Sequence, residues 1–420
     1  MSVLIVIVLV VLIILGAPLF AAIGASALLG FSRLDYNLVA VINEFYFGIA
    51  DEPVLLAIPL FTFAGFVLSE GRAPRRLVRL SEALLGWLPG GLAMISLTAC
   101  ALFTAFTGAS GITIIALGAV LYPALVASGY RERFSLGLVT TSGSLGLLFA
   151  PSLPLILYGI VAQVSIKDLF RAGIIPGLLM IVALSLYSSW QKREAPAKAE
   201  EWSPGMLWAA IVDARYELPL PIVVLGGIYS GFFAASEAAT VTVVYVLISE
   251  FILRREIPRS ELPQIVRKSM VLVGAIFMIL GLSQASTNYM LAIEVPERLF
   301  EFMNQYISSE AGFLIALLIF LLIVGAILDI FSAIVLVVPL VVPMALQFDV
   351  HPVHLGIVFL AAMELGYLTP PVGLNLFLSS YRFDRDIAEV YWSTLPFFVV
   401  LLLCVLLIAF IPQLSLLLVP

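Results

Sequence analysis

The chain has 420 residues, of which 62% are hydrophobic and only 11% are charged, and its mean hydropathy is +1.14. A water-soluble domain carries about 25% charged residues, so this composition excludes a soluble globular protein and predicts a polytopic membrane protein with about ten spans. The formal net charge is −6, from 21 basic and 27 acidic residues. The two cysteines, Cys100 and Cys404, both lie in apolar runs and predict no disulfide framework.

The N-terminal region begins with an uncharged apolar run over residues 3–31. We interpret it as a membrane helix, because it lacks the basic leader of a signal peptide and is longer than a signal sequence's apolar region. Arg33 and Asp35 mark a turn, and residues 53–68 form a further span. Residues 72–85 carry four arginines and predict an amphipathic arm helix that lies on the membrane surface.

Residues 92–127 contain two apolar arms that are each too short to cross a membrane upright. The small residues of Thr107-Gly-Ala-Ser-Gly-Ile-Thr113 join them and favour a re-entrant helical hairpin; the alternative is one over-long, glycine-rich helix. Residues 134–159 follow, interrupted by Gly146 and by Phe149-Ala-Pro-Ser-Leu-Pro154. Prolines and glycine at these positions do not continue a helix, so this segment is predicted to be a broken helix.

The second half of the chain repeats this order. Residues 191–217 are the one clearly polar stretch and predict a cytoplasmic linker between the halves. The predicted elements beyond it are an amphipathic arm at 294–308, a hairpin at 313–344 with its tip at Gly325-Ala-Ile-Leu-Asp-Ile-Phe-Ser332, a broken helix at 354–378 and a last span at 392–418.

The most informative stretch is Gly366-Tyr-Leu-Thr-Pro-Pro-Val-Gly-Leu-Asn375, which interrupts an apolar segment. An ordinary proline kink is one interpretation. The other is a break that lines a cavity, because unpaired backbone at membrane depth is tolerated only where protein encloses it. Pro371, Gly366 and Pro343 each follow an identical residue, Pro151, Gly146 and Pro123, by 220 positions. A repeated broken helix is typical of a secondary transporter's binding site, so we predict two repeats, residues 1–190 and 218–420.

The basic residues predict the orientation of these repeats. If residues 72–79 lie in the cytoplasm, only Lys167, Arg171 and Arg298 fall outside, which leaves 18 of the 21 basic residues inside. Both termini are then periplasmic, and the two hairpins enter the membrane from opposite faces. The repeats are therefore predicted to be inverted, as an alternating-access carrier requires.

The candidate site consists of the two hairpin tips, each expected to face the break in its own half. The candidate sodium ligands are hydroxyl and unwound-backbone oxygens: Thr107, Ser110, Gly111, Gly146, Gly325, Gly366, Thr369 and Gly373. The candidate substrate-binding residues are Ser110, Ser152, Asp329, Pro371 and Asn375. Helix N-termini near Gly111 and Ser332 are expected to point their partial positive charge at an anionic carboxylate. Neither tip contains an arginine, so anion binding is expected to depend on these helix ends, on hydroxyl groups and on bound sodium.

Acidic residues are costly within a bilayer, so Asp329, Glu237 and Glu364 are functional candidates by default. Asp329 is the strongest because it lies on a hairpin tip, whereas Glu237 and Glu364 are equally compatible with structural roles at helix ends. His351 and His354 lack the cysteine or acidic partners of a metal site, so no metal beyond sodium is expected. The absence of a nucleophile triad, a P-loop and a dinucleotide fingerprint argues against an enzyme and against an ATP-driven pump.

Three motifs resemble the large membrane subunit of the tripartite ATP-independent periplasmic (TRAP) transporters, over roughly residues 53–402. They are Thr107-Gly-Ala-Ser-Gly111, Gly227-Ile-Tyr-Ser-Gly231 with Ser236-Glu-Ala-Ala239, and Leu368-Thr-Pro-Pro-Val-Gly-Leu-Asn375. One segment departs from the pattern, since the family often has Thr-Pro-Thr-Glu where this chain has Ala235-Ser-Glu237.

The resemblance implies an all-α, elevator-type, sodium-coupled importer of small organic anions in a bacterial or archaeal inner membrane. It also implies two partners, a small four-helix membrane subunit and a periplasmic solute-binding protein. The residues alone leave open a stand-alone carrier of the same architecture, such as a dicarboxylate/Na⁺ symporter or a Na⁺/H⁺ antiporter.

Overall fold

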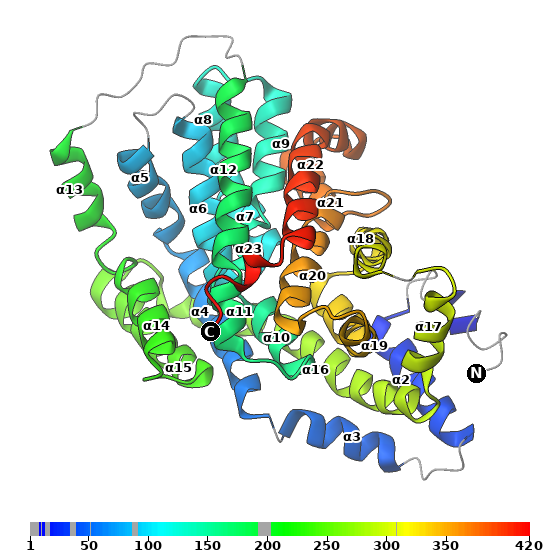
Figure 1. The fold of residues 1–420 in the computed structure, drawn as a ribbon. Helices are drawn as coiled ribbons and strands as arrows, with labels where there is room; N and C mark the ends of the chain where they lie inside the picture. Colours follow the sequence, from blue (N-terminus) through cyan, green and yellow to red (C-terminus); the bar gives the residue numbers. More distant parts are fainter. Residues whose placement is uncertain are drawn as a thin grey trace.

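The computed structural model describes residues 8–9, 11–12, 17–33, 39–50, 52–85, 91–191, 203–307 and 309–420, and the regular structure in these ranges is helical (Figure 1). Within them, seven helices are long and apolar enough to cross a membrane, and two bent helix pairs could each supply one more span. The prediction of an all-α polytopic membrane protein is therefore confirmed. The turn predicted at Asp35, part of the first predicted helix and residues 192–202 of the predicted linker lie outside the described residues.

One group of helices forms a frame along one side of the molecule. Its longest member, α16, has 31 residues and packs against α2, α3 and α4, while α4 also packs against α15. Figure 1 shows α2 and α3, in blue, beside α16. The bounds of the frame helices are α2 Leu19–Arg33, α3 Val39–Ala50, α4 Ala57–Glu70, α14 Pro219–Ser230, α15 Ala235–Leu247 and α16 Leu262–Ala292.

Two short amphipathic helices correspond to the predicted arms. The first, α5, spans Ala73–Leu85, and the second, α17, spans Val295–Asn304. On the inner face of α5, Leu80 and Ala83 pack against Ala210 and Ala214, the former in helix α13 (Pro204–Asp213) and the latter at its C-terminal cap. Part of the predicted linker is thus a helix docked on the first arm.

The first half of the chain forms a hairpin and a broken helix. Hairpin 1 consists of α6 (Gly91–Thr107) followed by α7 (Ser110–Ala116) and α8 (Gly118–Ala127), with a 51° bend between the last two. Broken helix 1 runs through α9 (Glu132–Ser142) and the 3₁₀ turn η2 (Leu145–Leu148), and resumes as α10 (Leu153–Val161). Helices α11 (Ile166–Ala172) and α12 (Ile174–Trp190) complete this half.

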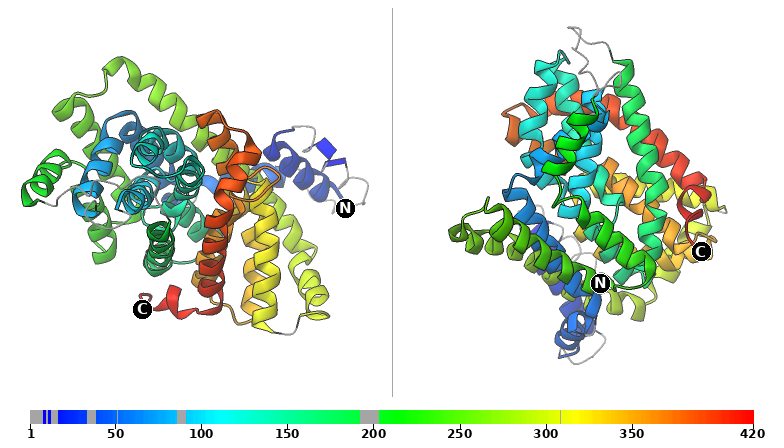
Figure 2. Two further views of the ribbon diagram at one scale, coloured as in Figure 1. Left: turned by 90° about the horizontal axis from the view of Figure 1, so that it is seen from above. Right: turned by 90° about the vertical axis from the view of Figure 1, so that its left-hand side faces the viewer.

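The second half forms the corresponding pair. Hairpin 2 consists of α18 (Glu310–Ile327) and α19 (Ile330–Gln347), whose N-termini are capped by the side chains of Ser309 and Asp329. Broken helix 2 consists of α20 (Pro352–Gly366) and α21 (Leu374–Phe383), so it extends five residues beyond the predicted end at 378. Helices α22 (Ile387–Phe410) and α23 (Gln413–Leu416) follow, and both views in Figure 2 show hairpin 2, in yellow to orange, beside the red α22.

The hairpins and broken helices interlock across the two halves. In hairpin 1, α6 packs on η2 and α9 of its own half, whereas α7 packs on α21 of the other half. In hairpin 2, α18 packs on α20 of its own half, whereas α19 packs on α10 of the other half. The largest cluster of buried apolar side chains runs through these elements and continues into the frame helices α4, α14, α15 and α16.

Candidate functional site

At the second break, hairpin 2 and broken helix 2 meet without intervening side chains. A Cβ atom on Gly325 would lie 3.0 Å from the Cα of Gly366. The backbone N–H groups of Val372 and Gly373 both donate to the carbonyl of Ala326, at 3.2 and 3.1 Å. The predicted sodium-site glycines Gly325, Gly366 and Gly373 are therefore brought together, with unwound backbone between them.

Two further bonds hold this break in place. The N–H of Ile330, the first residue of α19, donates to the hydroxyl of Tyr367 at 2.6 Å. Thr369 is half-buried, and its Oγ1 donates to the carbonyl of Leu365 at 3.1 Å. Since a hydroxyl has one proton and two lone pairs, Thr369 remains able to accept a cation.

The first break has the same close crossing. A Cβ on Gly146 would lie 2.6 Å from the backbone nitrogen of Ala105 and 2.2 Å from the carbonyl oxygen of Ala101. Ala105 precedes Gly325 by the same 220 positions that separate Gly146 from Gly366. Sequence reasoning identified Gly146, Gly366 and Gly325 but missed Ala105, which the repeat offset could have identified.

The tip of hairpin 1 is only partly arranged as predicted. Gly108 has a φ of +66° and packs on Leu153, so this part of the tip does lie at the first break. Gly111 instead faces Leu378 of α21, because a Cβ there would lie 2.6 Å from the leucine Cδ1. Sequence reasoning placed Gly111 opposite residues 146–154 because it could not anticipate that α7 packs on the other half.

Several buried oxygens in this region have no hydrogen-bond partner in the part of the chain that the structure describes. They are Thr107 Oγ1, Thr141 Oγ1, Ser152 Oγ and Asn375 Oδ1. Burying a polar oxygen without a partner is costly, so such atoms suit a site that accepts a cation or a polar solute. Three of them were candidate site residues, whereas Thr141 was missed because it lies within a regular stretch of helix α9.

A polar contact joins the two halves beside these oxygens. Asn375 Nδ2 donates to the carbonyl of Thr140 at 3.3 Å, and Thr140 Oγ1 donates to Ser379 Oγ at 2.9 Å. Ser110, at the start of α7, is 4% exposed, and α7 packs on the same helix, α21. The structure thus places Ser110 and Asn375 on adjacent helices, while Ser152 is buried at the first break and Pro371 is exposed at the second.

Asp329 has a more specific role than its position suggested. Its Oδ1 accepts from the N–H groups of Phe331 and Ser332, at 3.0 and 3.1 Å, and its Oδ2 accepts from the Ser332 hydroxyl. The expectation was that a helix N-terminus near Ser332 would face an anionic substrate. In the structure α19 begins at Ile330, and the carboxylate of Asp329 already occupies this N-terminus.

The remaining polar candidates differ in whether their side chains have hydrogen-bond partners. Glu237 Oε2 accepts from the N–H of Ala234 at 2.9 Å, which is the structural role left open for it, whereas Glu364 is buried with neither carboxyl oxygen paired among the described residues. His351 caps α20. His354 bonds Ser415 Oγ and the carbonyl of Ala409, at 3.1 and 3.2 Å. No group of three potential metal ligands occurs in the described ranges.

The first arm is held by a buried ion cluster that sequence reasoning missed. Arg76 Nε donates to Glu217 Oε1 and Nη1 donates to Glu256 Oε1, both at 2.6 Å, and Nη2 lies 3.6 Å from Glu250 Oε1. Burial alone would raise the pKa of Glu256, but its hydrogen bonds with Arg76 and the Arg72 N–H lower that pKa overall. Arg76, in the helix predicted to lie on the membrane surface, is only 5% exposed and is thus buried against protein.

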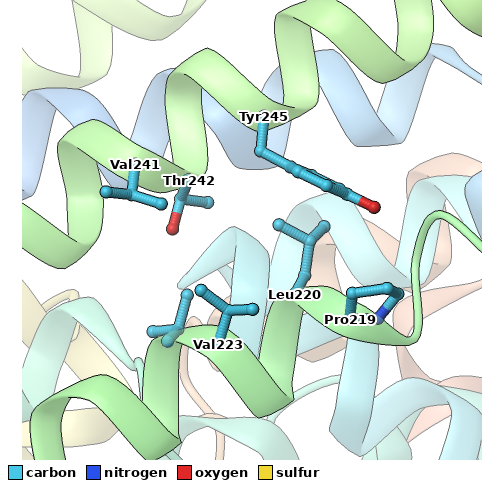
Figure 3. Close-up of a pocket in the computed structure, with 7 residues that line it drawn as sticks. Pro219, Leu220, Val223, Val241, Thr242 and Tyr245 are labelled. Atoms are coloured by element: carbon cyan, nitrogen blue, oxygen red, sulfur yellow. The ribbon is translucent and has the colours of Figure 1, made fainter.

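A small cavity in the frame is not a substrate site. It lies between α14 and α15, holds about 20 Å³, and is lined mainly by apolar side chains together with Thr242 and Tyr245 (Figure 3). That volume accommodates about one water molecule. The candidate site is therefore the interlocked tips and breaks.

The sequence profile of the family described as "Tripartite ATP-independent periplasmic transporter, DctM component" matches residues 6–414. The C4-dicarboxylate TRAP transporter large permease protein DctM of Pseudomonas aeruginosa is 31% identical over 399 residues, which cover 94% of this chain and 92% of that protein. The ectoine TRAP transporter large permease protein TeaC of Halomonas elongata is 28% identical and covers 96% of each chain.

The isethionate TRAP transporter permease protein DctMQ of Oleidesulfovibrio alaskensis is 31% identical over 95% of this chain, which spans only 63% of the length of that relative. Among solved structures, the YdaH transporter of Alcanivorax borkumensis matches with a TM-score of 0.59 and 15% identity, covering 88% of this chain and 86% of that one. At that identity the match concerns the fold alone.

Proposed function

This chain belongs to the DctM component family of the tripartite ATP-independent periplasmic transporters, and from that premise we propose that it carries a small organic anion across the inner membrane together with sodium. The supporting observation is the paired crossing at the two breaks, Gly325 on Gly366 and Ala105 on Gly146. Each crossing lies beside a helix break and a hydroxyl-bearing residue, Thr107 in the first half and Thr369 in the second, and secondary transporters bind sodium at such unwound backbone.

Two sodium positions follow from this arrangement. At the first break the ligands would come from Thr107, Ser110 and Gly146, and the unpaired Thr107 Oγ1 supports this assignment. At the second break they would come from Gly325, Gly366, Thr369 and Gly373. Bound sodium would supply positive charge near the substrate, which is useful because an anion needs a counter-charge in a medium of low dielectric constant.

The substrate would lie between the tips, in contact with Ser110, Ser152, Pro371 and Asn375. The unpaired Ser152 Oγ and Asn375 Oδ1 are the most direct support, because each has bonding capacity that the described residues do not use. Asp329 would act through the start of α19, which it caps. Two relatives are named for C4-dicarboxylates and isethionate, which are small organic anions.

The mechanism would be an elevator movement of the interlocked core against the frame. The hairpins and broken helices of the two halves pack on one another, and the first arm α5 packs on α6 of hairpin 1 while its Arg76 pairs with Glu217, just before the frame helix α14. A small membrane subunit would brace the frame, and a periplasmic binding protein would deliver the solute. By the positive-inside rule, both chain termini would lie in the periplasm.

Uptake by proteoliposomes tests the proposal. The chain is reconstituted alone, with a small membrane subunit, and with both partners, under an inward sodium gradient. We expect uptake only with both partners, and none of the free solute by the chain alone. Sodium-driven uptake by the isolated chain would instead identify a stand-alone carrier.

A further inference from the structure

An apolar pocket of about 350 Å³ opens between the second arm, α17, and hairpin 2. Its walls come from three helices and include Leu299 and Met303 of α17, Ala316 and Phe320 of α18, and Leu340 and Met344 of α19. Leu317 of α18, also in the wall, is only 4% exposed, so the pocket reaches the edge of the core. It is separate from the tips and breaks that form the candidate transport site.

The two arms differ in what covers them. The space beside the first arm, α5, is only about 130 Å³, and Leu218, Leu220 and Pro221 from the second half of the chain close over it. The second arm packs mainly on α16 and α19, and its Leu299 and Phe302 remain 38% and 59% exposed. The larger pocket therefore remains open beside the second arm.

We propose that this pocket binds one acyl chain of a phospholipid with a zwitterionic headgroup, of the phosphatidylethanolamine type. The surroundings favour hydrocarbon, because α18 is a candidate span whose outer face carries Ile315, Ile319 and Ile323, all about half exposed. Side chains of this kind face lipid in a membrane protein.

The depth of the pocket along α18 matches the thickness of one leaflet of the bilayer's hydrocarbon core. Its wall on α18 runs from Phe313 to Phe320, within ten residues of the helix start at Glu310. At a rise of about 1.5 Å per residue, ten residues span about 15 Å, which is half of a hydrocarbon core about 30 Å thick. A lipid anchored at the α17 interface can therefore fill the pocket with one chain.

A flexible hydrocarbon chain is narrow enough to enter an apolar pocket of about 350 Å³. A partner helix on this face is an alternative outcome of the test below.

The charges on α17 select the headgroup. Glu294 is at the N-cap position of the helix, Glu297, Arg298 and Glu301 lie in it, and all four are exposed, which gives a net charge of −2 on these residues. An anionic headgroup would be repelled there. In a zwitterionic headgroup the ammonium can approach the carboxylates while the phosphate approaches Arg298.

The test uses the full-length chain in lipid nanodiscs that contain a trace of phosphatidylethanolamine with a photoreactive group in one acyl chain. After irradiation, mass spectrometry locates the labelled peptides. We expect labelling concentrated on the pocket walls of α17, α18 and α19. Labelling spread evenly over the exposed hydrophobic surface would overturn the proposal without any variant having to fold.

Two variants on one helix then sharpen the result. Ala316→Trp fills the pocket and should abolish the concentrated labelling, whereas Ile323→Trp, on the lipid-facing side of α18 and outside the pocket, should leave it intact. Unchanged labelling in Ala316→Trp contradicts the site. The same label on phosphatidylglycerol should give weaker labelling, and equal labelling would refute the headgroup assignment.

A further experiment distinguishes a bound lipid from a bound protein. A photoreactive amino acid replaces Leu340 in the chain expressed with its partners in cell membranes. We expect an adduct with the mass of a phosphatidylethanolamine. Capture of a protein would overturn the proposal and identify this face as a subunit contact.

Discussion

Gly325 and Gly366 cross at a distance that leaves no room for a side chain, since a Cβ on Gly366 would lie 2.7 Å from the Cα of Gly325. The crossing joins the tip of hairpin 2 to the break that follows α20. Because both partners are backbone, neither can move aside as a flexible side chain would. The geometry of the second candidate sodium position therefore depends on these two glycines.

The first prediction is that Gly366→Ala destabilises the protein and reduces uptake. The added methyl group meets backbone, and overpacking of this kind costs about 1–3 kcal/mol. The measurement is the denaturation midpoint of the purified chain, with uptake in parallel. Gly274→Ala is the matched control: no atom of the described residues lies within 4 Å of a Cβ at this exposed position in α16. Replacing a helical glycine there should stabilise by about 0.5–1 kcal/mol.

Equal effects of the two substitutions would contradict this prediction. The effect of Gly366→Ala would then come from losing a glycine in a helix and not from a clash at the close crossing. A fully active Gly366→Ala protein would remove the argument that the crossing shapes the site.

The second prediction separates two neighbouring arginines. Arg76→Ala leaves Glu217 and Glu256 without their shared partner, and removing one partner of a buried ion pair costs about 3–5 kcal/mol. Arg75 is exposed on the same helix, so Arg75→Ala should change stability by no more than about 0.5 kcal/mol. Thermal unfolding of both variants provides the measurement.

The same pair tests the arm in transport. If α5 transmits motion between frame and core, Arg76→Glu should abolish uptake while sodium binding to the core persists, and Arg75→Glu should retain uptake. Similar losses in both variants would mean that the overall charge of the arm matters and not its buried contact.

The third prediction concerns Asp329. Asparagine caps a helix about as well as aspartate, so Asp329→Asn should keep the start of α19 and most of the uptake, whereas Asp329→Ala should lose about 1 kcal/mol and much of the uptake. Asp386→Ala is the control, because Asp386 caps α22 away from the tips. If Asp329→Asn is as inactive as Asp329→Ala, the negative charge itself acts on substrate or sodium.

The helices, tips and breaks were predictable because glycine and proline act locally on the backbone. The 220-residue offset between Gly146 and Gly366 and between Pro151 and Pro371 made the second break interpretable from the first. The cap on α19 could also have been predicted from the sequence, since Asp329 immediately precedes an apolar helical run.

Contacts between distant segments could not be predicted in this way. The partners of Arg76 lie 141 and 180 positions away, at Glu217 and Glu256, and no periodicity connects them. The packing of Gly111 on Leu378 depends on how the two halves interlock, which is a property of the folded core. A basic helix therefore suggested the membrane surface, whereas one of its arginines is buried in protein.

The last prediction tests the sodium assignment of Thr369. Valine keeps the shape of threonine but has no oxygen, so Thr369→Val removes one proposed ligand. Loss of about 1.4 kcal/mol of binding free energy would raise the sodium concentration for half-maximal uptake about ten-fold.

Thr240 in α15 is a matched control: its hydroxyl donates to the carbonyl four residues earlier, at 2.9 Å, as that of Thr369 does at 3.1 Å, but it lies on the frame. We expect Thr240→Val to leave the sodium dependence unchanged. Unchanged sodium dependence in a normally expressed Thr369→Val protein would reject Thr369 as a ligand, and an equal shift in both variants would attribute the effect to the lost helix hydrogen bond.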